Sequence, residues 1–171
     1  MKQNLRKIIL VVLGIAILYL GSDLVKKMYL KTNGDKLTKD LPELTLANLD
    51  GNDVPLNSLS EGKNLLFIYF SSECSHCVDE IQMLKKEKSF RKNIDIYLIS
   101  IEDARVLRKF TQRLGITKED NLHFLVDAEW EFPLLYDVEA TPSMYFYNAD
   151  GKLVSKHVGT LGVEGIQAKF N

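Results

Sequence analysis

The chain has 171 residues, of which 46% are hydrophobic and 26% charged, a composition that suits one globular domain with an added segment. Its 22 Lys and Arg residues nearly balance its 23 Asp and Glu residues, so there is neither a basic field for nucleic acid nor an acidic tail. No internal repeat or low-complexity tract is visible, and nothing calls for a second globular domain.

The N-terminal segment has the features of a membrane anchor. Three basic residues precede an uncharged apolar stretch over 8–22, which reaches membrane-spanning length if it extends to Val25 with Asp23 at the interface. The stretch is apolar on all sides, which excludes an amphipathic core helix. Because "LYLGSD" is a poor cleavage site, residues 1–25 are predicted to be an uncleaved anchor rather than a signal peptide.

A polar segment separates the anchor from the rest of the chain. Residues 26–40 carry several lysines and the turn-forming pair Asn33-Gly34, so a stalk or linker is expected there. This division leaves residues 41–171 as the globular domain. Its first part holds short apolar stretches divided by Asp50-Gly51, a hairpin signal.

Apolar runs of strand length alternate with helical patterns through the middle of the domain. Continuous apolar and aromatic runs predict buried strands at 64–70, 93–101 and 122–126. Helical spacing predicts helices from about 74 to 88, from an Asp103 cap to Gly115, and around 129–136.

The C-terminal part has the pattern of an antiparallel hairpin followed by a helix. Two strands, at 143–147 and 152–158, flank a turn at 148–151, and a short helix is expected from about Val163. Strand-helix-strand-helix-strand followed by a hairpin predicts an α/β fold, with a mixed sheet flanked by helices.

The only two cysteines, Cys74 and Cys77, lie directly after the first buried strand, in "FIYFSSECSHCVDE". At the start of a helix, residues three apart share a face at about 5–6 Å, close enough for a disulfide. The free amides and positive dipole end of the helix lower the pKa of Cys74, which speeds thiol-disulfide exchange. The spacing therefore predicts a redox-active pair in which Cys74 attacks and Cys77 resolves.

Charged neighbours act on this pair in opposite directions. As imidazolium, His76 would stabilise the Cys74 thiolate and make the couple more oxidising. The carboxylates of Glu73, Asp79 and Glu80 would raise the thiol pKa instead. The sequence does not decide which influence is larger.

Two other uses of the cysteines fit the sequence less well. A structural disulfide three residues long would close a tiny loop and stabilise little. A metal site needs more ligands, and His76 lies too near in sequence to join both cysteines, while His123 and His157 are distant. A C-x-x-C pair that follows a buried strand and opens a helix favours the redox interpretation.

From Leu41 to about Gly165 the chain resembles the thioredoxin superfamily, and more closely its exported TlpA/ResA-like branch. The resemblance lies in "LPELTLANLDGNDVPLNSLSEGKNLLFIYFSSECSHC" and in "VEATPSMYFYNADGKLV". It implies that Pro142 is a cis-proline facing the cysteine pair. It also implies that the backbone of Thr141 pairs with an extended substrate chain. The alternative for Pro142 is a trans proline at the start of a strand.

The chain departs from the family pattern at several positions. Glu73 replaces the usual tryptophan before the first cysteine, and Gln82 replaces the proline that kinks the helix. Ile68 stands where cytosolic thioredoxins bury a carboxylate, so proton transfer with Cys77 lacks that base. Glu80, where the branch commonly has glutamate, is a candidate substitute, although a partly solvated helix residue is the simpler expectation. Trp130 is expected to be a packing residue.

Together these features predict a membrane-anchored, extracytoplasmic thiol-disulfide oxidoreductase, in the periplasm or on the outer face of a single membrane. Its substrates would be exported proteins with cysteine pairs, and no cofactor is implied because electrons move by exchange alone. The resemblance further implies a membrane-embedded redox donor. It favours a reductant, whereas His76 is similar in position to a histidine of oxidising members, which leaves an oxidase or isomerase open.

Two alternatives come from other functional classes. A peroxide-reducing enzyme of the related peroxiredoxin fold would have a T-x-x-C setting, which Ser71 and Ser72 do not reproduce. A copper-binding chaperone would have cysteines four apart and a downstream histidine. Here the spacing is three, and His157 is the only distal candidate.

Overall fold

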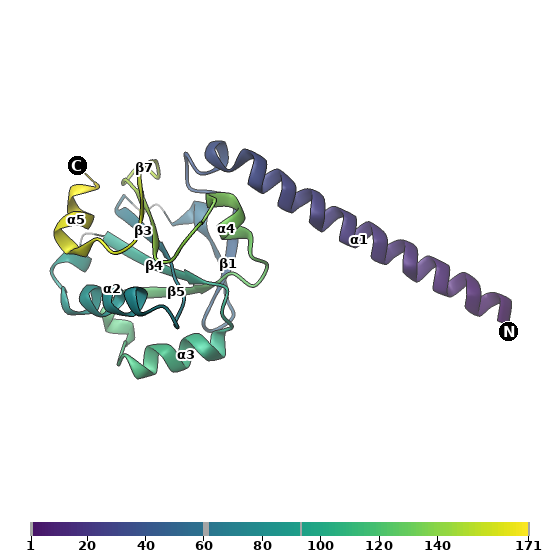
Figure 1. The fold of residues 1–171 in the computed structure, drawn as a ribbon, viewed down its shortest axis with the longest axis horizontal. Coiled ribbons are helices and arrows are strands. Elements are labelled where there is room, and N and C mark those ends of the chain that lie inside the picture. The colour runs from purple at the N-terminus through teal and green to yellow at the C-terminus, as the bar shows by residue number, and fades with distance from the viewer. Residues whose placement is uncertain (1, 60–61, 93, 171) are drawn as a thin grey trace.

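The structure is a computed structural model that describes residues 2–59, 62–92 and 94–170. One helix, α1 (Lys2–Leu37), extends away from an α/β body (Figure 1). The strands of that body are β1 (Thr45–Asn48), β2 (Asp53–Pro55), β3 (Asn64–Tyr69), β4 (Ile94–Ser100), β5 (Leu122–Val126), β6 (Ser143–Tyr147) and β7 (Leu153–Val158). The remaining helices are α2 (Ser75–Lys86), α3 (Ala104–Arg113), α4 (Glu131–Tyr136) and α5 (Gly162–Ala168).

The strands form one mixed sheet in the order β2-β1-β5-β4-β3-β6-β7. The central strands β3, β4 and β5 are parallel, and the other pairings are antiparallel. The carboxyl ends of the parallel strands therefore meet at one edge of the sheet, where functional groups gather in open α/β folds. The predicted α/β class is confirmed, and the expected elements of the body are observed with ends shifted by no more than two residues.

Helices cover both faces of the sheet. On one face, α2, α3 and α5 bury an aliphatic and phenylalanine-rich cluster that includes Ile68, Ile81 and Phe110. On the other face, α4 and the end of α1 cover a cluster dominated by tyrosine and phenylalanine. There the rings of Tyr69 and Phe132 stack with centroids 5.7 Å apart. Since β3 is buried on both faces, its continuous apolar sequence is explained.

Helix α1 is one unbroken element of 36 residues. Within the described residues it is the one helix long and apolar enough to cross a membrane, and its apolar part is fully exposed. The segment 26–40, expected to be a stalk or linker, is helical as far as Leu37. The division of the chain at residues 25 and 40 stays a prediction.

The body holds the C-terminal part of α1 through both apolar and polar contacts. Leu30 and Leu37 pack against the aromatic cluster. The carbonyl of the buried Thr38 accepts a 2.8 Å hydrogen bond from the Tyr147 hydroxyl. A side-chain carbon added at Gly34 would clash with the Leu135 carbonyl oxygen of α4. Asn33-Gly34 is thus not a turn, because the glycine allows two helices to approach closely.

We expect Gly34→Ala to lower the free energy of unfolding of the body by about 1–3 kcal/mol, because the new methyl group forces α1 away from α4. The loss would occur although alanine favours a helix over glycine by roughly 0.5–1 kcal/mol. Urea unfolding of the full chain in detergent measures it. Gly21→Ala is the matched control, since no atom lies within 4 Å of its added carbon. Equal stability of the two variants would contradict the close approach.

Candidate active site

The two cysteines lie at the edge of the sheet where the parallel strands end. β3 leads directly into the loop that starts α2, and Cys74 is the residue that caps this helix. In the neighbouring strand, Ser143 pairs with Tyr69, which brings the preceding Thr141–Pro142 peptide to the same edge. That peptide bond is cis, as the resemblance implies. Sheet pairing therefore brings together residues 67 positions apart in the chain.

The Cys74 sulfur is surrounded by hydrogen-bonding groups. The backbone N–H of Cys77 donates to Cys74 Sγ at 3.3 Å, so the sulfur takes the place of the oxygen that usually caps a helix. The Cys74 thiol lies 3.6 Å from the Thr141 carbonyl oxygen, to which it donates. The Cys77 thiol and the His76 backbone N–H also bond to this sulfur. Both cysteines are present as free thiols.

The two thiols differ in burial and therefore in acidity. Cys77 is 1% exposed, and burial, together with its thiol hydrogen bond to Cys74, raises its pKa to about 12. Partial burial also raises the pKa of Cys74, but the hydrogen bonds from Cys77 and His76 stabilise the thiolate and lower it overall. Cys74 is thus the more accessible and the more acidic of the two thiols.

Glu80 does not match the expectation of a partly solvated residue. It lies one helical turn after Cys77, is 4% exposed, and accepts a 3.2 Å hydrogen bond from the Leu161 backbone N–H. Its other oxygen has no hydrogen-bond partner among the described residues. Burial raises the pKa of this carboxyl, although the amides of Leu161 and Gly162 oppose the shift. The expectation failed because the loop before α5, distant in sequence, covers this face of α2.

The side chain of His76 is exposed, on the first turn of α2. Only the backbone N–H of His76 is observed to bond to the Cys74 sulfur. The effect of its imidazole on the couple stays a prediction. His157, the distal histidine of the copper alternative, lies on β7 near Glu80. Within the described ranges, no group of three or more His, Cys, Asp or Glu side chains is placed to hold a metal ion.

Two residues that the sequence analysis missed, Glu102 and Arg113, hold the loop before Cys74. The carboxylate of Glu102 accepts hydrogen bonds from the Ser72 backbone N–H at 2.9 Å and from its hydroxyl at 2.6 Å. Arg113 of α3 donates to the Ser72 carbonyl oxygen at 3.3 Å. All the polar groups of Ser72 are thus bonded to the β4–α3 segment. The sequence could have indicated Glu102 by its position alone, because it follows β4, a strand parallel to β3.

A buried strand that leads into a C-x-x-C helix cap opposite a cis-proline defines a thioredoxin-like thiol-disulfide oxidoreductase. The chain belongs to the AhpC/TSA family, whose profile matches residues 37–156.

Similar proteins share this class and fold. The chain is 23% identical to the thiol-disulfide oxidoreductase ResA of Bacillus subtilis (strain 168) over 125 residues, 71% of this chain and 67% of that protein. It is 22% identical to ResA of Bacillus anthracis over 165 residues, 93% and 91% of the two chains. The exposed lipoprotein thioredoxin Etrx1 of Streptococcus pneumoniae superposes with a TM-score of 0.62 at 21% identity, covering 74% of this chain and 96% of that one.

The difference in acidity predicts selective alkylation. With iodoacetamide at pH 7, the reduced protein should be labelled at Cys74, while Cys77 reacts far more slowly. A pKa of about 12 instead of 9.0 leaves roughly a thousandfold less thiolate at Cys77. Peptide mass spectrometry over time measures both rates, and the urea-unfolded protein, in which the two thiols should react alike, is the control. Comparable rates in the folded protein would contradict the assignment.

Proposed function

We propose that the protein is a membrane-anchored reductant that exchanges disulfides with exported proteins outside the cytoplasm. The observation that carries the exchange chemistry is the asymmetric thiol pair: an accessible Cys74 of lowered pKa beside a buried Cys77 of raised pKa. The reducing direction is proposed from the resemblance to the ResA-like branch. The apolar length of α1 supports anchoring. The ResA relatives support the redox class, and nothing in their names specifies a substrate for this chain.

In the proposed reaction, the Cys74 thiolate attacks one sulfur of a substrate disulfide. A Cys74–substrate disulfide forms, and the second substrate sulfur leaves as a thiolate that takes up a proton. Cys77 then loses its proton and attacks Cys74 Sγ, which forms the Cys74–Cys77 disulfide and releases the first substrate sulfur. Two electrons pass to the substrate, and a separate dithiol donor must reduce the protein again.

The Thr141–Pro142 peptide is proposed to position the substrate chain. The Thr141 carbonyl oxygen lies 3.6 Å from Cys74 Sγ, so a peptide bonded to this backbone would present its disulfide to the attacking sulfur. Short β-pairing of this kind is independent of substrate sequence, because it uses main-chain groups only. It suits an enzyme that acts on several exported proteins.

Glu80 is proposed to accept the Cys77 proton. The two residues are one turn apart on α2, and the unpartnered Glu80 oxygen has no competing donor among the described residues. Since burial raises its pKa, the carboxyl can hold and release a proton nearer to neutral pH than an exposed glutamate. In this role Glu80 would substitute for the buried carboxylate that cytosolic thioredoxins have at the position of Ile68 in β3.

Glu80→Gln should slow the resolving step by roughly a hundredfold, the usual contribution of a positioned proton acceptor. The same substitution should raise the stability of the folded protein at neutral pH, although it slows the reaction. Because the folded-state pKa is raised, the wild-type loses stability as the pH rises above the ordinary value of 4.5 and through the folded pKa, as the buried group becomes charged. The variant should lack this loss.

Stopped-flow reduction of a model disulfide and urea unfolding from pH 4 to 9 measure the two effects. Asp79→Asn, at the exposed neighbouring position, is the matched control and should change neither property appreciably. A Glu80→Gln variant with unchanged rate at every pH would remove Glu80 from the proton path.

The direction of electron flow is tested by the reduction potential of the pair in the full-length protein in detergent, equilibrated with dithiothreitol and glutathione buffers. A value near −270 mV, roughly that of thioredoxin, is expected for a reductant. A value near −120 mV, roughly that of strong oxidants, would mean that the protein donates disulfides. Failure to form the internal disulfide at any potential would overturn the exchange mechanism and favour metal binding.

A further inference from the structure

Trp130, the only tryptophan of the chain, is held in an unusual position. The sequence predicts a packing residue here, yet 52% of its surface is exposed. Its backbone is left-handed, with φ of +58°, a conformation that bulky residues rarely adopt and that glycine would adopt freely. One edge of the indole reaches the Tyr69 hydroxyl, which leaves much of the ring in contact with solvent. Such an outlier is a reason to look for a binding role.

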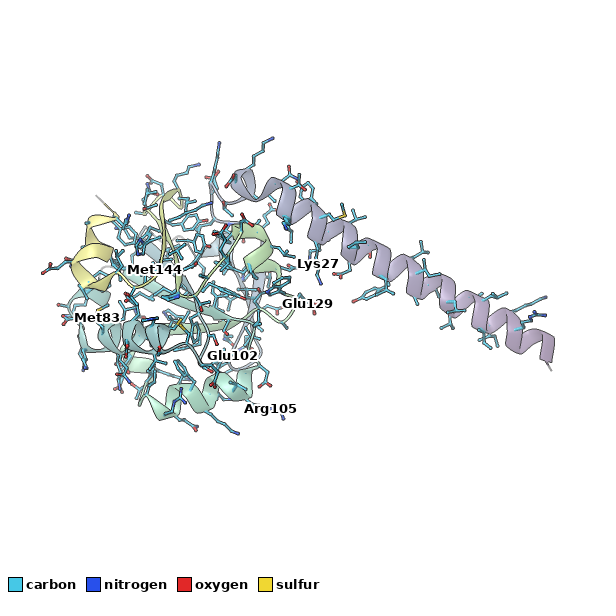
Figure 2. All side chains as sticks on the ribbon, viewed as in Figure 1. Lys27, Met83, Glu102, Arg105, Glu129 and Met144 are labelled. Carbon is cyan, nitrogen blue, oxygen red and sulfur yellow. The ribbon has the colours of Figure 1, made fainter. Side chains whose placement is uncertain are left out.

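Trp130 lies in the loop before α4, and an ion pair made by the next residue fixes its level relative to α1. Glu131 forms an ion pair with Lys26 of α1. Figure 2 labels Lys27 on α1 and Glu129 on the loop before α4, the two segments that this ion pair joins. Lys26 directly follows Val25, where the apolar segment ends, and one residue of helix adds about 1.5 Å. The polar layer of a bilayer is roughly 5–7 Å thick on each side. Residues 129–131 therefore lie at the level of that layer if α1 spans the membrane.

The body cannot easily move away from this level. The close approach of Gly34 to Leu135 and the hydrogen bond between Tyr147 and Thr38 make the end of α1 part of the body. Because α1 continues without a break into its apolar half, the orientation of the body follows that of the spanning helix. The 129–131 segment thus keeps its level relative to α1.

We propose that Trp130 inserts its indole into the phospholipid headgroup layer of the membrane that α1 spans, and so holds the body against the bilayer. The inference rests on the proposed membrane anchoring. Tryptophan is the side chain most suited to this layer, since its ring is apolar and its N–H can stay hydrogen-bonded.

This docking also places the redox edge of the sheet. Tyr69, which the indole contacts, pairs with Ser143 directly after Pro142, and its strand leads into Cys74. The edge that carries the cysteines is therefore kept near the membrane surface. Disulfides presented close to the bilayer, on lipid-anchored or membrane-spanning partners, are the substrates that this arrangement favours.

Because Trp130 is the only tryptophan, its fluorescence tests the proposal directly. The full-length protein is reconstituted in phosphatidylcholine vesicles, with and without lipids brominated on the upper part of the acyl chain. We expect brominated lipid to quench Trp130 severalfold and lipid to shield it from acrylamide. The matched control is a Trp130→Phe/Val154→Trp variant, which moves the indole to an exposed position on β7 and should remain unquenched by lipid.

A second variant separates failure of the inference from failure of the anchor. Trp130→Phe/Tyr19→Trp places the indole in the exposed apolar part of α1, where brominated lipid should quench it strongly if the helix spans the membrane. Quenching there without quenching of Trp130 would overturn the docking and leave the anchor intact. Absence of quenching in both would overturn the anchor as well. A Trp130 signal that ignores lipid but shifts in a Cys77→Ser mixed disulfide would assign the indole to a protein partner and overturn the proposal.

Discussion

The hydrogen bond from the Cys77 backbone N–H to Cys74 Sγ joins the fold of this protein to its chemistry. It exists because a strand buried on both faces ends where a helix begins, so that a cysteine occupies the capping position. The first turn of any helix has amide groups without partners. Here a sulfur satisfies one of them, and it does so better as a thiolate than as a thiol. The same hydrogen bond therefore caps the helix and stabilises the Cys74 thiolate.

The rest of the site amplifies the difference between the two thiols. Cys77 faces the apolar cluster between α2 and the sheet, where a charge is costly. Cys74 faces the Thr141 carbonyl and the solvent side. Glu80 sits in the same buried layer as Cys77, under the loop that precedes α5. If Glu80 takes the Cys77 proton as proposed, that proton passes between two buried groups one helical turn apart on α2.

Sequence reasoning succeeded where the signal was local. The buried strands, the helix opened by Cys74 and the turns near Gly51 and Gly151 follow from periodicity and backbone preference, and they place the cysteine pair. It failed where distant segments decide. The burial of Glu80 depends on Leu161, and the hold on the loop before Cys74 depends on Glu102. The helical course of α1 past its apolar segment depends on a close contact at Gly34. None of these contacts leaves a periodic trace in the chain.

The rigid junction at Gly34 has a consequence for how often the site meets its partners. A disordered tether of the 15 residues from 26 to 40 would let the body range over roughly 20 Å and sample partners at many heights. If α1 spans a membrane as proposed, a helical arm instead gives the site a single height and orientation above the lipid. Its effective concentration is then high for partners whose disulfide lies at that height and falls toward zero for others. Arm length thus acts as a filter on partners that the active-site chemistry itself does not distinguish.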